Sequence, residues 1–124
     1  YTNTRARADG IGAGLKNTAI IIADQGPEVD NAGIVNDFAA TLCNEYSVTE
    51  GDVTYGDWYL PSKYELNQMY INRSTLDAAS GFNSLYWSST EYGYYSAWFQ
   101  DFSNGDQGSF GKVNTCIVRA VRAF

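Results

Sequence analysis

Hydrophobic and polar positions change their spacing most clearly at residues 56–66, GDWYLPSKYEL. An aromatic run stops at Pro61, which fixes its own φ, lacks an N–H donor and favours an extended residue before it. Ser62 and Glu65 then have the spacing of a capping box, in which each side chain accepts a hydrogen bond from the backbone at the start of a helix. Apolar residues continue at helical spacing to about residue 72. The stretch predicts a strand that turns directly into a helix.

A glycine-rich stretch, DGIGAG at residues 9–14, precedes the first predicted helix, which covers residues 15–23. Gly26 and Pro27 favour the end of this helix, because glycine often follows a helix and proline cannot continue one. The glycines are spaced G-x-G-x-G and no apolar strand precedes them, so they favour a flexible turn over a phosphate-binding loop. Residues 1–8 predict an edge strand or an entry arm.

A second helix is predicted from Asp30 or Asn31, either of which can cap it, to about Tyr46. Its apolar residues recur near helical spacing, which places Cys43 on the buried face. Residues 47–55 are rich in Thr, Glu, Asp and Gly, and they predict a polar loop.

The pattern changes again toward the C-terminus, after an irregular or weakly helical stretch at residues 73–83. Strands are predicted over residues 85–91, 96–102, 109–113 and 115–124, with a tight hairpin at 92–95 and an Asn-Gly turn at 103–108. Helices followed by antiparallel strands predict an α+β domain, in which two to three N-terminal helices pack on a C-terminal antiparallel sheet. A length of 124 residues suits one such domain over residues 1–124.

Composition narrows the class of protein. Apolar residues make up 44% of the chain, and no run approaches the roughly 18 residues of a membrane span, so we expect a globular domain without membrane insertion. There is no initiator Met and no charged-then-apolar leader, so we expect Tyr1 to mark a fragment or a mature start. Ten tyrosines suit a recognition surface, although tyrosine is also favoured in strands.

The charge is acidic overall and uneven along the chain. A net charge of −6 argues against nucleic acid as a partner. Residues 1–16 hold Arg5, Arg7 and Lys16 against Asp9, a local charge of +2, which leaves −8 for the remainder. A polyanionic ligand would therefore need a local basic patch, and a symmetric oligomer could merge such patches into a stronger field.

Cysteines and acids offer few candidates for metal chemistry. Cys43 and Cys116 are 73 positions apart, which excludes a local metal knuckle. A disulfide worth about 2–4 kcal/mol is favoured if the protein is exported, and two buried thiols are expected if it is cytosolic. Asn104 and Asp106 supply oxygens that calcium could use, but their glycine-containing turn favours an ordinary turn, and we expect no metal or other cofactor.

Catalysis is disfavoured because the chain has no histidine, which removes the commonest general base and zinc ligand. Glu91 with Asp101 is the one carboxylate pair that could hydrolyse a glycoside. Acids near hairpins are more often solvated turn residues, so the sequence predicts a protein that is not an enzyme.

Several motifs occur in a fixed order over nearly the whole chain. They are Gly12-x-Gly14-x-x-Asn17-Thr18-x-x-Ile21, Ala39-x-x-x-Cys43, Gly56-Asp57-Trp58-Tyr59-Leu60-Pro61-Ser62-Lys63-x-Glu65-Leu66, Tyr86-Trp87-Ser88-Ser89-Thr90-Glu91, Ala97-Trp98, Phe102, Gly105, Lys112 and Val118-Arg119-Ala120-Val121-Arg122. Together they resemble the C-terminal domain of Legionella collagen-like protein and its bacterial relatives. The resemblance implies a C-type-lectin-like architecture, related to that of formylglycine-generating enzymes and hypervariable receptor proteins.

The resemblance also implies a function. Its best-known member is a surface adhesin whose domain follows a collagen-like stalk, forms a homotrimer and binds sulfated polysaccharides such as glycosaminoglycans. We therefore expect an extracellular, cell-surface adhesin head that promotes attachment or biofilm formation and contributes to virulence. The alternative is a protein-binding module that uses the tyrosine-rich hairpin, as hypervariable C-type-lectin-like receptor proteins do.

Candidate residues follow from charge, exposure and the resemblance. The predicted ligand-binding residues are cations and tyrosines that we expect at the surface: Arg5, Arg7, Lys16, Lys63, Lys112, Arg122, Tyr94 and Tyr95. The predicted structural residues are Trp58, Pro61, Glu65, Trp87, Trp98 and Arg119. Two arginines three positions apart on a strand face opposite sides, so we expect Arg119 to pair with a buried acid such as Asp57 or Glu65.

Overall fold

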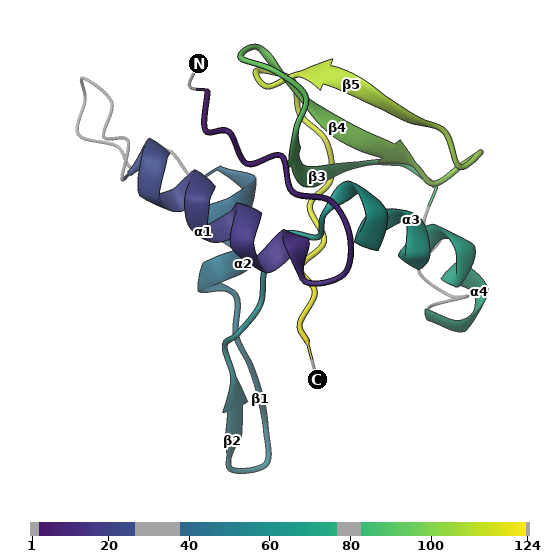
Figure 1. Ribbon diagram of the computed structural model, residues 1–124. Helices are drawn as coiled ribbons and strands as arrows, with labels where there is room; N and C mark the ends of the chain where they lie inside the picture. The colour runs from purple at the N-terminus through teal and green to yellow at the C-terminus, as the bar shows by residue number, and fades with distance from the viewer. Residues whose placement is uncertain (1–2, 27–37, 77–82, 124) are drawn as a thin grey trace.

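Helices fill the N-terminal half of the chain and an antiparallel sheet fills the C-terminal half, in a computed structural model that describes residues 3–26, 38–76 and 83–123 (Figure 1). The described helices are α1 (Ala13–Gln25), α2 (Ala39–Glu45), α3 (Lys63–Ile71) and α4 (Arg73–Leu76). The strands are β1 (Val48–Glu50), β2 (Val53–Tyr55), β3 (Leu85–Glu91), β4 (Ser96–Asp101) and β5 (Gln107–Gly111). The predicted α+β class is confirmed, and no helix in the described ranges is long and apolar enough to cross a bilayer.

Strand β3 lies at the centre of the fold because both of its edges are used. One edge pairs with β4, which in turn pairs with β5. Along the other edge, three alternate residues of β3 donate their backbone N–H groups to carbonyl oxygens of other segments at 2.8–3.0 Å. The acceptors are the carbonyls of Ile117, Pro61 and Ala6. The N-terminal segment, the junction before α3 and the C-terminal segment therefore all meet at this strand.

Two predicted strands are reduced to isolated bridges by this arrangement. The prediction over residues 115–124 is wrong in its described part, where Ile117 bridges Tyr86 and Val121 bridges Tyr59 without forming a ladder. Residues 56–60 likewise contribute only the Tyr59 bridge. Because three segments share one edge of β3, none of them can run beside it for a full strand. Residue 124 lies outside the described residues.

The capping box before α3 is confirmed. The Ser62 hydroxyl accepts a hydrogen bond from the Glu65 N–H at 3.2 Å, and the Glu65 carboxylate accepts one from the Ser62 N–H at 3.1 Å. This fixes the start of α3 so that its inner face packs on the sheet, in a core formed by Leu66, Met69, Tyr70, Tyr86 and Phe102.

Helix α1 begins two residues earlier than predicted and ends as expected at Gly26, whose φ is 57°. It lies so close to the junction before α3 that a Cβ on Gly14 would stand 2.5 Å from Glu65 Oε1. The second predicted helix is confirmed in its described part, α2, where Cys43 is buried. Its predicted start at residues 30–31 lies outside the described residues.

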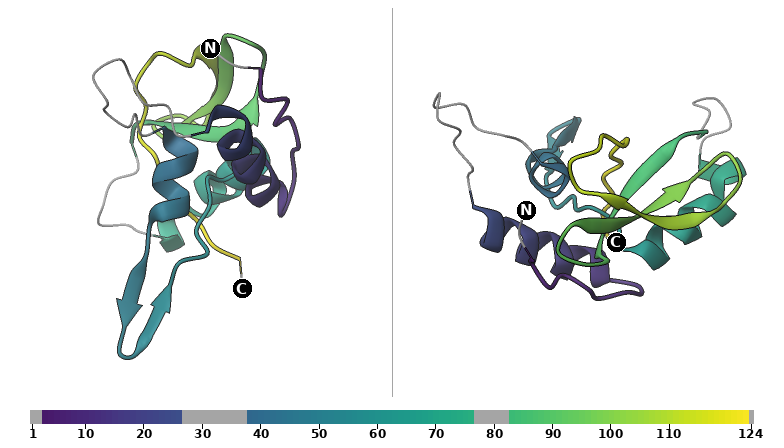
Figure 2. Two further views of the ribbon diagram at one scale, coloured as in Figure 1. Left: turned by 90° about the vertical axis from the view of Figure 1, so that its left-hand side faces the viewer. Right: turned by 90° about the horizontal axis from the view of Figure 1, so that it is seen from above.

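Residues 47–55 form a hairpin and not the predicted loop. β-Branched residues occupy four of the six strand positions, and Gly51 adopts the positive φ of 60° that a two-residue hairpin turn uses. The β1–β2 hairpin projects away from the rest of the domain (Figures 1 and 2). In the predicted irregular stretch, residues 73–76 form α4 and residues 77–82 are outside the described ranges.

Candidate functional site

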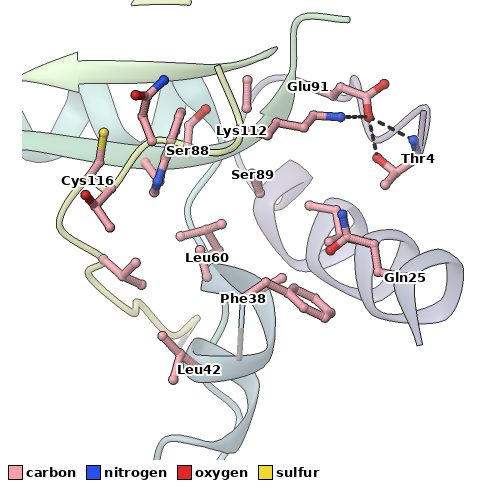
Figure 3. A pocket seen from close by; sticks show the side chains of 18 of the residues that line it. Thr4, Gln25, Phe38, Leu42, Leu60, Ser88, Ser89, Glu91, Lys112 and Cys116 are labelled. Carbon is pink, nitrogen blue, oxygen red and sulfur yellow. Dashed lines mark hydrogen bonds and ion pairs between the residues drawn. The ribbon is translucent and has the colours of Figure 1, made fainter. Parts of the chain in front are cut away.

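Glu91 ends β3, and its carboxylate joins the N-terminal segment to the sheet. The side chain is 2% exposed. It accepts hydrogen bonds from the Thr4 N–H at 2.8 Å, the Thr4 hydroxyl at 2.9 Å and the Arg5 N–H at 3.2 Å. The Lys112 ammonium forms an ion pair with it at 2.8 Å (Figure 3). Glu91 therefore has a partner on both sides, the N-terminal segment and the residue after β5.

The environment of Glu91 keeps it charged. Burial raises its pKa, but the hydrogen bonds from Lys112 and Thr4 outweigh burial and hold the pKa below its usual range. Arg7 adds an ion pair at 3.9 Å from a side chain that is 56% exposed. The expectation that Glu91 is a solvated turn acid is wrong, because it is a buried anion that holds two segments together.

The geometry does not make Glu91 and Asp101 a catalytic pair. Asp101 lies opposite Leu85 at the start of β3, whereas Glu91 ends that strand. Six residues of strand span roughly 20 Å, about twice the largest carboxylate separation that glycoside hydrolysis uses. The other predicted oxygen site is an ordinary turn, in which the Asn104 side chain accepts the Asp106 N–H at 2.8 Å. Within the described ranges, no three potential metal ligands lie together.

The hairpin that follows Glu91 exposes three aromatic rings. Tyr92, Tyr94 and Tyr95 are 45–66% exposed. Tyr92 packs edge-on against Trp98 at a centroid distance of 5.3 Å, and the Lys63 ammonium lies 3.9 Å from the centroid of the same Trp98 ring. The Lys63 ammonium and the rings of Tyr92 and Trp98 therefore lie together at the surface.

The N-terminal arginines lie next to Glu91, the residue that precedes this hairpin. Thr4 and Ala6 are buried while Arg5 and Arg7 are exposed, so both arginines point outward. Arg5 has a φ of 60°, the one positive value at a non-glycine position in the described ranges. Its N–H binds Glu91 in this strained conformation, so the Glu91 contact helps to offset the strain.

These contacts define a hairpin-end surface, made of Arg5, Arg7, Lys63, Tyr92, Tyr94, Tyr95, Trp98 and Lys112. It unites six of the predicted ligand-binding residues, although Lys112 is only 17% exposed, which contradicts its expected exposure. Tyr92 was not among the ligand-binding residues predicted from the sequence. Its position in the same tyrosine-rich hairpin as Tyr94 and Tyr95 could have indicated it. The four cations of this surface, set against Glu91 and the adjacent Asp9, leave a local charge of +2 in a chain of −6.

The other two predicted ligand-binding residues lie elsewhere. Lys16 is exposed on α1. Arg122 is at the base of the β1–β2 hairpin, where its Nε lies 2.6 Å from Asp57 and its guanidinium lies 4.3 Å from the Tyr55 ring centroid. Asp57, one of the acids expected to pair with Arg119, pairs with Arg122, and this contact raises the pKa of Arg122 and lowers that of Asp57.

The predicted structural residues occupy packed positions, with one exception. Pro61 is buried, and Trp58 donates its indole N–H to the Tyr55 carbonyl at 2.9 Å. The ring centroids of Trp87 and Phe110 lie 6.2 Å apart. Arg119 is exposed. Glu65 is held by donors other than an arginine: the N–H groups of Gly12, Gly14 and Ser62 and the hydroxyl of Tyr59.

A largely apolar groove of about 400 Å³ opens beside the Glu91–Lys112 pair (Figure 3). Leu42, Leu60 and Val118 are among the residues that line it, and Cys116 lies on its wall. Cys43 and Cys116 are free thiols in the structure, so the expected disulfide is not formed here. Burial raises the pKa of Cys43 to about 12 and also raises that of Cys116.

Comparison with known proteins agrees with the resemblance found in the sequence. The family model described as the Lcl C-terminal domain matches residues 18–122. A search of curated proteins found no match. The matched range contains the sheet, α3 and the tyrosine-rich hairpin, while Arg5 and Arg7 precede it. The chain therefore belongs to the family of Lcl C-terminal domains, which are adhesin-type surface modules.

Proposed function

We propose that this domain is the head of an extracellular, homotrimeric adhesin and that it binds sulfated polysaccharide through the hairpin-end surface. One observation carries the proposal: cations and exposed aromatic rings gather at one end of the sheet, although the chain as a whole is acidic. Sulfate groups suit arginine and lysine donors, and aromatic faces offer apolar contact to sugar rings. Attachment to matrix or host surfaces would follow from such binding.

The arrangement of the side chains supports a long, repeating ligand. Arg5 and Arg7 are both exposed on a short N-terminal turn, in which the Arg7 N–H donates to the Arg5 carbonyl at 2.8 Å. The Lys63 ammonium lies over the Trp98 ring, and Tyr92 in the hairpin packs against the same ring. A flexible sulfated chain could therefore contact cations from the N-terminal segment and from α3 at once. A trimer would place three such surfaces in one field.

The test is binding to immobilised heparin-type glycan and to its desulfated form, titrated across salt. We expect binding to require sulfate and to weaken steeply with salt, because each cation–sulfate contact is screened. Arg5→Ala with Arg7→Ala should weaken binding about 10-fold or more at low salt. The matched control is Arg73→Ala, an exposed arginine on α4. Binding by a folded protein that ignores sulfate, or equal losses in both variants, would contradict the proposal.

A protein receptor is the second candidate, because Tyr94 and Tyr95 stack edge-on at 4.7 Å in the exposed turn. Rigid tyrosines of this kind make low-entropy contacts in protein interfaces. Protein capture that is insensitive to salt, and that is lost in Tyr94→Ala and Tyr95→Ala, would favour this function over glycan binding. Both candidates are binding functions, and we propose no catalytic one.

A further inference from the structure

Helix α1 exposes large apolar residues although it buries polar ones. Its fully buried residues are small or polar, and Asn17 and Thr18 are buried because they hydrogen-bond to Ala8 and Leu60. Leu15 is 52% exposed and Ile20 is 41% exposed, whereas Ile21 and Ile22 are half-buried. We call the outward residues Leu15, Lys16, Ala19, Ile20 and Ala23 the outer face of α1. An apolar helix face of this kind is a common mark of an interface.

The β1–β2 hairpin is a second feature that the fold itself does not explain. In the described residues, β1 and β2 pack extensively only against each other, and the hairpin points away from the domain (Figures 1 and 2). An isolated two-stranded hairpin is marginally stable in water. Its tip carries two acids, Glu50 and Asp52, next to Val53, which is 51% exposed.

The base of this hairpin is nevertheless held firmly. The Trp58 indole donates to the Tyr55 carbonyl at 2.9 Å and packs edge-on against Tyr46 at 5.1 Å. Arg122 binds Asp57 and lies over the Tyr55 ring. The hairpin is therefore an oriented arm on a fixed base, and its tip points away from its own α1 (Figures 1 and 2).

We propose that the tip of the β1–β2 arm docks on the outer face of α1 of a second copy of this chain. The two surfaces are complementary in charge and in apolar character. Val53 would pack against Leu15 and Ala19, while Glu50 and Asp52 would lie beside Lys16 of the neighbouring copy. Asp24, eight residues beyond Lys16 and about 12 Å along the helix, would repel the tip and restrict docking to the N-terminal half of α1.

This contact is heterologous, because each copy offers an arm and accepts another. A head-to-tail contact of this type closes into a ring when its rotation allows. The proposal adds a specific interface to the expected trimer, and it does not depend on glycan binding, since Arg5 and Arg7 take no part in it.

The test is the mass of the protein in solution, measured by sedimentation over a range of concentrations. Asp52→Lys and Lys16→Glu should each weaken self-association about 10-fold or more, because each puts like charges together. The matched control is Asp106→Lys, an exposed turn acid on the other side of the domain, which should leave the mass unchanged. Leu15→Asp should weaken association by about 100-fold if it removes a central apolar contact.

The decisive variant combines Glu50→Lys and Asp52→Lys with Lys16→Glu, which exchanges the charges and restores opposite signs across the same contact. We expect it to regain most of the association lost by either single change. A wild-type protein that stays monomeric, or single variants that assemble like the control, would overturn the proposal. Failure of the combined variant to recover, while its circular dichroism spectrum matches the wild type, would also overturn it. Heparin binding by the monomeric variants would show that the glycan surface is separate.

Discussion

Replacing Glu91 with glutamine tests the central contact of the structure. The change preserves shape but removes the charge that Lys112 pairs with at 2.8 Å. It also replaces one acceptor oxygen with an NH₂ donor, in a site where the surrounding groups are already donors: the Thr4 N–H and hydroxyl, the Arg5 N–H and the Lys112 ammonium. In the variant, the new NH₂ group therefore faces other hydrogen-bond donors, and Lys112 loses the anion that it pairs with.

The expected cost can be worked from burial. Removing one partner of a buried ion pair typically costs about 3–5 kcal/mol, because the other charge stays buried and unpaired. The Lys112 side chain is 17% exposed and can recover part of its hydration. We therefore expect Glu91→Gln to lower the free energy of unfolding by about 2–4 kcal/mol, a large share of the stability of a domain of this size.

Urea denaturation followed by tryptophan fluorescence measures this loss. The matched control is Glu45→Gln, an exposed glutamate at the end of α2, which should change the free energy of unfolding by less than about 0.5 kcal/mol. A loss below about 1 kcal/mol for Glu91→Gln, with an unchanged urea dependence, would refute the view that this carboxylate holds the N-terminal segment to the sheet.

The pH dependence of the free energy of unfolding provides a second test of the same contact. The pKa of Glu91 is lower in the folded protein than its usual value, so its stabilisation is present above that usual value. The stabilisation is lost as the pH falls through the folded-state pKa, because the unfolded chain takes up the proton first. Glu91→Gln should remove this part of the acid sensitivity, and a variant that loses stability in acid as steeply as the wild type would contradict the assignment.

Three further predictions concern local structure and the thiols. Ser62→Ala should lower the free energy of unfolding by about 1–2 kcal/mol in urea titrations, because it removes the capping hydroxyl. Gly14→Ala should cost about 2 kcal/mol or more in the same measurement, because its Cβ would stand 2.7 Å from two backbone atoms, whereas Gly56→Ala, with open space, should cost far less. Iodoacetamide at pH 8 should modify Cys116 well before Cys43, as mass spectrometry of the native protein would show, because Cys43 is more deeply buried and its pKa is about 12. Equal rates for the two thiols would contradict the burial of Cys43.

The local features of this protein could be predicted from its amino-acid sequence. The Ser62–Glu65 capping box, the break at Pro61 and the tight hairpin at residues 92–95 each depend on residues a few positions apart, which contact one another in most compact arrangements of the chain. The order of helices and strands was predictable for the same reason. The ordered motifs also identified the family, which the match over residues 18–122 confirms.

Contacts between side chains far apart in the sequence depend on the tertiary structure and could not be predicted. Glu91 binds Thr4 from 87 positions away, and Arg122 binds Asp57 from 65 positions away. Charge type and hydrophobic spacing cannot choose among such partners, so Lys112 was expected at the surface and Arg119 was expected in the ion pair that Arg122 makes. The exposure of Leu15 and Ile20 on α1 could not be predicted for the same physical reason: burial depends on which hydrogen-bonding groups the neighbouring segments present to Asn17 and Thr18, and on whether those segments cover Leu15.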